Sequence, residues 1–113
     1  MIVVEVINRI NNNVVLVKDG KTKMIVTGKG IGFKTYPGDI VNERFVEQRF
    51  ILQKDDDASQ YVKLLKEIPM ELLGVSKQIV EMAESELDYK FSLNLVFTLA
   101  DHFSFSVERY KKI

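Results

Sequence analysis

The sequence predicts an α+β fold in two segregated parts, an N-terminal four-stranded antiparallel β-sheet followed by a partial α-helical bundle. In the first half, short β-branched and apolar runs are separated by asparagine, glycine and proline turns, as in strands. The segment Lys54–Ser59 brings three consecutive aspartates and interrupts this pattern. Apolar residues then recur at helical spacing, as at Tyr61, Leu64, Leu65 and Ile68.

The expected strands follow from the apolar runs and from the turns between them. They lie at residues 2–7, 14–17, 24–26 and 45–52. Asp19-Gly20 is a strong hairpin signal, because glycine accepts the positive φ of a primed turn. Asn11–Asn13 and Pro37–Asp39 supply two further reversals. Because so short a stretch of chain cannot cover both faces of a sheet, we expect this part to dimerise.

The second half is expected to form three helices. Ser59 could cap the first, Pro69 separates it from a second at 70–87, and a third runs from 92 to 110. The residues expected to face inward on the third helix are Leu93, Val96, Phe97, Ala100, Phe103 and Val107. The predicted domains are residues 1–55, a linker at 56–60 and a helical domain at 61–113.

Composition excludes several classes of site. The 113-residue chain has no cysteine and one histidine, which rules out disulfides, thiolate nucleophiles and metal sites that need several histidines. No apolar run approaches the roughly 20 residues of a membrane span. We therefore expect a cytoplasmic protein that is not an enzyme, with no catalytic residue, metal or cofactor.

The net charge of zero hides a difference between the two halves. Residues 1–54 carry nine basic and five acidic side chains, a net +4, whereas residues 55–113 carry seven basic and eleven acidic ones, a net −4. Such a split suggests an anionic partner for the first half, although surface charge can also be uneven without a ligand.

The stretch TGKGIGFK, residues 27–34, places three glycines at alternate positions among basic and aromatic residues. Its spacing fits neither a dinucleotide fingerprint nor a P-loop. In a loop between strands, the glycines would allow a close backbone approach, Lys29 and Lys34 could meet phosphates, and Phe33 could stack on an unpaired base. The alternative is a tight turn with Phe33 in the core. Asn11–Asn13, if adjacent, would add amides that match base edges and ribose hydroxyls.

These motifs occur in an order that resembles the BglG and LicT family of transcriptional antiterminators. The N-terminal domain of that family is similar in VINRINNNVVLV (6–17), GKGIGF (28–33), GDIV (38–41) and RFIL (49–52). The segments IPME (68–71) and LADHFSFSVER (99–109) resemble the start of its phosphotransferase regulation domain. The chain contains only part of that second domain, so we expect a fragment or a truncated product.

The resemblance implies a dimeric sheet that binds an RNA hairpin with internal loops and stabilises it against an overlapping terminator. The RNA-binding positions that it implies are Asn8, Asn11, Asn13, Gly28, Lys29, Gly30, Phe33 and Lys34. His102 matches a histidine phosphorylated by the sugar phosphotransferase system, whose phosphocarrier or sugar permease would be a partner of the full-length parent. By itself, a lone histidine among phenylalanines is more often a structural residue than a functional one.

Two other functions remain open from the sequence. The chain could be an oligomerisation or protein-interaction module whose basic surface is incidental, which predicts no preference for hairpin RNA. It could also be a phosphoryl-accepting relay centred on His102, which labelling by a phosphohistidine donor would reveal.

Overall fold

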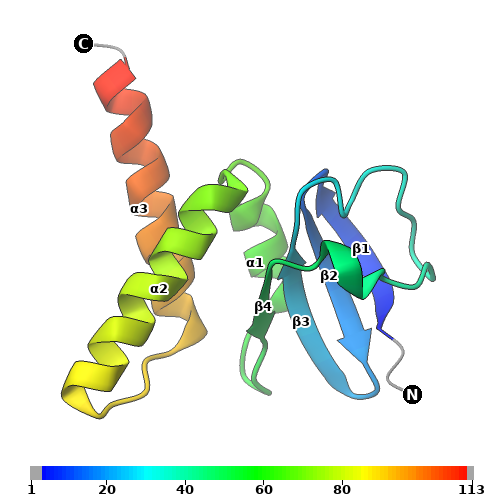
Figure 1. The fold of residues 1–113 in the computed structure, drawn as a ribbon, viewed down its shortest axis with the longest axis horizontal. Coiled ribbons are helices and arrows are strands. Elements are labelled where there is room, and N and C mark those ends of the chain that lie inside the picture. The colour runs from blue at the N-terminus through cyan, green and yellow to red at the C-terminus, as the bar shows by residue number, and fades with distance from the viewer. Residues whose placement is uncertain (1–3, 112–113) are drawn as a thin grey trace. The chain divides into compact units, whose positions relative to one another are not determined.

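The computed structural model describes residues 4–111, which divide into two compact units, one ending at Lys66 and the other beginning at Glu67 (Figure 1). The first unit contains the strands β1 (Glu5–Asn11), β2 (Val14–Asp19), β3 (Thr22–Thr27) and β4 (Gln48–Ile51), the short 3₁₀ helix η1 (Glu43–Phe45) and the helix α1 (Ala58–Leu65). The second contains α2 (Met70–Leu87) and α3 (Leu93–Lys111). The predicted fold class is confirmed.

The four strands form an antiparallel meander in the order β1-β2-β3-β4. Val15 and Val17 of β2 pack with Met24 and Val26 of β3 in a core cluster that also includes Ile31. Their neighbours on the opposite face are also buried, because side chains alternate along a strand. Both faces of the two central strands are therefore buried, which explains why their apolar runs do not alternate with polar residues.

Two of the predicted reversals have the backbone geometry that their glycines suggested. Gly20, between β2 and β3, has φ 61°, and Gly38 has φ 95°. After Gly38 the chain runs along the outer edge of β1, where Val6 N–H donates to Asp39 O at 2.8 Å and Val41 N–H donates to the carbonyl of Val4 at 2.9 Å. This contact covers an edge strand that would otherwise leave its backbone groups unpaired.

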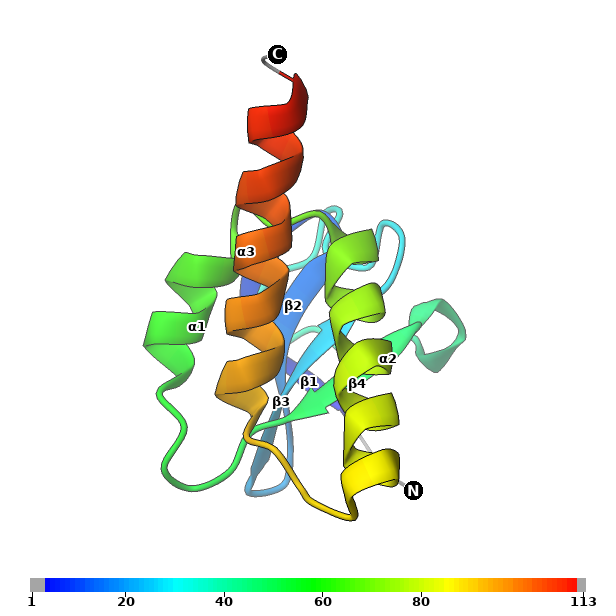
Figure 2. The ribbon, with the colours of Figure 1, turned by 90° about the vertical axis from the view of Figure 1, so that its left-hand side faces the viewer.

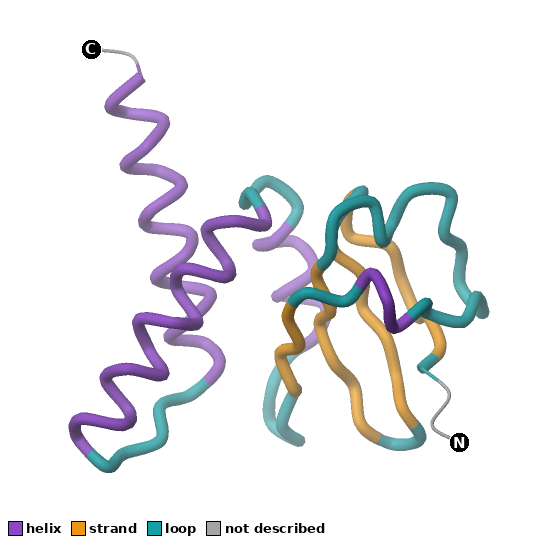
Figure 3. Tube along the Cα trace, viewed as in Figure 1, coloured by secondary structure: helices purple, strands orange, loops and turns teal. Residues whose placement is uncertain are grey.

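Two predicted strands differ by several residues from the observed ones. The first strand continues to Asn11 instead of ending at residue 7, and residues 2 and 3 lie outside the described residues. The closing strand begins at Gln48, because the preceding residues form η1 (Figure 3). The sheet unit extends to Lys66 and includes α1, whereas the proposed domain boundary near residue 55 and the proposed dimerisation stay predictions.

The cap of α1 is Asp57, so the prediction of Ser59 was wrong. The Asp57 carboxylate accepts hydrogen bonds from the backbone N–H groups of Ser59 and Gln60. The Ser59 hydroxyl donates to the same carboxylate at 2.8 Å, and this hydrogen bond is the main cause that lowers the pKa of Asp57. Burial of Tyr61, together with its hydrogen bond to Asp56, raises the pKa of that phenol to about 12.

The second unit is a hairpin of two helices, α2 and α3 (Figures 1 and 2). Its seam contains Leu73 and Val80 of α2 and Val96, Phe97 and Ala100 of α3. The inward-facing prediction for α3 is thus confirmed at three positions, whereas Leu93 and Phe103 are half-buried and Val107 is exposed. Val107 lies in the last turns of α3.

Candidate nucleic-acid interface

The asparagine turn and the glycine loop are joined by hydrogen bonds into one surface. Gly28 N–H donates to Asn13 O at 3.0 Å, and Gly32 N–H donates to Asn12 O at 2.8 Å. Gly30 N–H donates to the Asn13 side-chain oxygen, Oδ1, at 2.9 Å. The predicted adjacency of the two segments is therefore confirmed, although they are separated in the sequence by two strands.

Two of the glycines are needed because there is no room for a side chain. A Cβ on Gly28 would lie 1.8 Å from the Phe45 carbonyl oxygen, and a Cβ on Gly32 would lie 2.1 Å from the Asn11 carbonyl oxygen. Gly30 has open space but a φ of 75°, which other residues rarely adopt. The loop thus combines close backbone packing with two left-handed residues, Gly30 and Lys34 (φ 52°), and this combination fixes its shape.

The oxygens of the two asparagines are used inside the protein. Asn11 Oδ1 accepts from the backbone N–H of Asn13 at 2.8 Å, and Asn13 Oδ1 accepts from Gly30. Asn11 Nδ2 reaches the carbonyl oxygen of Lys66 at 3.4 Å. An approaching ligand would therefore meet the Nδ2 donor of Asn13 more readily than a side-chain carbonyl, since that carbonyl already has a partner.

Arg9 has a structural role that sequence reasoning missed. Its Nε donates to the Gly32 carbonyl oxygen at 3.0 Å, and its Nη2 donates to Oδ1 of Asn12. The guanidinium therefore ties β1 to both segments of the surface. Its position beside Asn8 in the sequence carries no signal for this role, because the contact depends on how two distant turns meet.

The exposed part of the surface is cationic and aromatic. Phe33 is 61% exposed, which excludes the alternative that placed it in the core. The Lys34 ammonium lies 5.5 Å from the centroid of the Phe33 ring, within cation–π range. Lys29 is exposed between Gly28 and Gly30. Cationic and aromatic side chains thus lie side by side on this loop.

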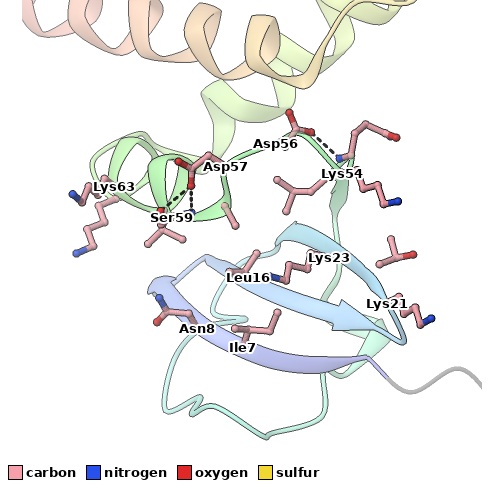
Figure 4. A pocket seen from close by; sticks show the side chains of 16 residues that line it. Ile7, Asn8, Leu16, Lys21, Lys23, Lys54, Asp56, Asp57, Ser59 and Lys63 are labelled. Carbon is pink, nitrogen blue, oxygen red and sulfur yellow. Dashed lines mark hydrogen bonds between the residues drawn. The ribbon is translucent and has the colours of Figure 1, made fainter.

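Asn8 lies apart from these residues, in a cleft between the sheet and α1 (Figure 4). The cleft has a volume of about 1100 Å³ and an apolar floor that includes Ile7, Leu16 and Val62. Its lysines are Lys21, Lys23, Lys54, Lys63 and Lys66. The structure therefore brings together seven of the eight predicted RNA-binding residues and places Asn8 on a neighbouring surface.

His102 is exposed on α3, in the second unit. Its accessibility is compatible with modification, and it has no part in the surface built by the sheet unit. Within residues 4–111, no group of three or more histidine, aspartate or glutamate side chains is arranged to hold a metal ion. No helix in that range is long and apolar enough to cross a membrane.

Comparison with known proteins identifies the sheet unit. Residues 4–59 match the family described as the CAT RNA binding domain. Residues 4–59 belong to this family. The chain is 34% identical over 104 residues to the "Beta-glucoside operon antiterminator" of Dickeya chrysanthemi and 35% identical over 104 residues to the "Transcription antiterminator LicT" of Bacillus subtilis, with 91% of the chain covered in each case. The resemblance to the BglG and LicT family is confirmed.

The chain spans 37% and 38% of the lengths of these two relatives. Its fold resembles the crystal structure of GlcT CAT-PRDI with a TM-score of 0.67 and 24% identity. That match covers 97% of this chain and 66% of the other. The likeness supports the arrangement of a sheet followed by helices, and at this level of identity it shows the fold alone.

Proposed function

We propose that this chain is an RNA-binding transcription antiterminator. It would bind an irregular RNA hairpin in the leader of a sugar-utilisation operon and stabilise that hairpin against an overlapping terminator. The observation that carries the proposal is the surface at residues 11–13 and 28–34, which exposes two lysines and a phenylalanine within a segment that matches an RNA-binding domain. The relatives are regulators of transcription, and no reaction is proposed for this chain.

The roles of the individual residues follow from the contacts. Lys29 and Lys34 would neutralise phosphates, and Phe33 would stack on an unpaired base, as RNA-binding proteins commonly do. Gly30 would let the RNA backbone approach the loop, while Gly28, Asn11 and Asn13 hold its shape and Asn13 offers an amide donor. Asn8 would contact the RNA from the neighbouring cleft.

The proposal extends to assembly and regulation. A homodimer would present two copies of this surface to one RNA stem, in the cytoplasm where transcription takes place. In the full-length parent, His102 would be phosphorylated by the phosphotransferase system. Incubation with a phosphohistidine donor should label the chain, and His102→Ala should abolish the label.

Binding of a looped hairpin tests the central claim. Phe33→Ala should weaken binding by about 1–3 kcal/mol if the ring stacks on a base, and should leave unfolding unchanged because the side chain is exposed. Phe105→Ala is the matched control, since Phe105 is 62% exposed and has Arg109 5.9 Å from its ring centroid. Gel shifts with the hairpin and with an unrelated duplex measure both variants. Equal affinity for the two RNAs would instead favour an interaction module with an incidental basic surface.

A further inference from the structure

A hollow lies next to the glycine loop, on the side of η1. Its volume is about 390 Å³, and it is lined by residues of the glycine loop and of the segment 39–45. The lining residues used below are Phe33, Asp39, Asn42 and Phe45. The hollow therefore borders the proposed RNA-binding surface and shares Phe33 with it.

Phe45 is an exposed aromatic side chain on a firmly held segment. Phe45 is 56% exposed. It lies in η1, although the sequence pattern placed it at the start of a strand. The backbone of Phe45 lies directly against the glycine loop, since a Cβ on Gly28 would come within 1.8 Å of the Phe45 carbonyl oxygen. Glu47 N–H also donates to Thr27 O at 2.7 Å, which joins the segment to β3. Phe33 and Phe45 line the same hollow, so two exposed aromatic side chains border one space.

The polar groups of the hollow favour a base over a phosphate. Asn42 Oδ1 accepts from Arg44 N–H at 3.0 Å, so a ligand would meet the Nδ2 donor of Asn42. One oxygen of Asp39 accepts from Tyr36 N–H at 2.9 Å, and the carboxylate charge would repel a phosphate. A flat, neutral ring with polar edges meets both conditions and can stack on an aromatic side chain.

We propose that this hollow holds an unpaired nucleobase of the bound RNA, stacked on Phe45 with one edge toward Asn42. The proposal rests on the proposed RNA-binding function and deepens it by assigning a base subsite to residues outside the glycine loop. Two phenylalanines at the border of one hollow can hold a base more firmly than Phe33 alone, because each additional stacking contact adds to the affinity.

A single tryptophan provides a direct test, because the chain contains none. In Phe45→Trp, the indole would lie where the base is proposed to stack, and titration with the looped hairpin should strongly quench its fluorescence. Tyr36→Trp is the matched control: Tyr36 is 66% exposed and lies outside the lining of the hollow, so its quenching should be much weaker. Unchanged Phe45→Trp fluorescence in a complex that a gel shift shows to be formed would overturn the subsite.

Affinity gives a second and independent readout. Phe45→Ala should weaken binding of the looped hairpin about tenfold to a hundredfold, and Asn42→Ala should weaken it less. Binding of a fully paired stem should change little, because it offers no unpaired base. If the wild-type protein prefers the hairpin and Phe45→Ala binds it equally well, the subsite is refuted and the proposed function is not. Wild-type protein that does not prefer the hairpin refutes the proposed function as well.

Discussion

The sheet unit and the helical unit bury their apolar residues to different extents. In the sheet unit, all residues in the ranges 14–17 and 24–28 are buried, and seven core residues form one cluster beneath the loop that follows β3. In α2 the buried residues are Leu73, Ser76 and Val80, while the side chains of Val75 and Met82 are exposed. A sheet that is covered on both faces has buried side chains on each of them. Two packed helices bury side chains only along the one seam between them. The candidate binding surface therefore lies on the unit that has the larger core.

The largest expected effect is a difference in thermal stability between the two units when each is produced as a separate fragment. Residues 1–66 should fold alone and unfold cooperatively, because the core cluster and the glycine-loop contacts all lie within them. Residues 67–113 alone should show little stable helix, because α2 and α3 pack along a single seam that has few buried side chains. Circular dichroism during thermal unfolding measures both fragments. Cooperative unfolding of the helical fragment, or an unstructured sheet fragment, would contradict the comparison.

The next largest effect is expected from adding one methyl group to a glycine, which should change the unfolding free energy in opposite directions in the two units. Gly28→Ala should cost about 1–3 kcal/mol of unfolding free energy, because its Cβ would overlap the Phe45 carbonyl oxygen and the backbone must shift. Gly74→Ala, in α2, is the matched control: nothing lies within 4 Å of its Cβ, and alanine should stabilise the helix by about 0.5–1 kcal/mol. Denaturant unfolding gives both values. A neutral Gly28→Ala would mean that the loop is less tightly packed than the distances indicate.

The sequence predicted the architecture because local signals and tertiary structure agree in most elements. The order of strands and helices, the hairpin at Gly20 and the turn at Gly38 each depend on neighbouring residues, so pattern and φ preference suffice. The boundary at η1 was missed for a different reason. Phe45 fits a strand pattern, yet its segment is positioned by Gly28, a residue far away in the chain.

The candidate site was predictable in its composition and less so in its geometry. Lys29 and Phe33 stand out in the sequence because glycines flank them, and both are exposed in the structure. The role of Arg9 depends on the meeting of two turns, and the separation of Asn8 depends on where α1 packs. Neither contact has a local signature, so both required the fold.

The start of α1 should make the stability of the sheet unit depend on pH. Because hydrogen bonds lower the pKa of Asp57 from its ordinary value of 3.8, its contribution is fully present above that pH. The contribution is lost as the pH falls through the lowered value. Asp57→Asn keeps a side-chain oxygen as a cap acceptor without the charge, so the difference in stability between the two proteins should vanish in acid. Unfolding of residues 1–66 between neutral and acidic pH measures this difference, and a constant difference would show that the carboxylate charge has no part in the cap.

The smallest expected effect concerns one charge on the binding surface. Lys29→Gln should reduce the slope of log affinity against log salt concentration by about 0.7–0.9, because one counterion is released for each phosphate neutralised. Lys90→Gln, which removes an exposed lysine from the helical unit, should leave the slope unchanged. Both variants replace an ammonium group with a neutral amide, so a change confined to Lys29 would reflect the charge at that position. Gel shifts of the looped hairpin at several salt concentrations give the slopes. Equal slopes for the two variants would place Lys29 outside the phosphate contacts, and the surface would then depend on Phe33, Lys34 and the shape of the loop.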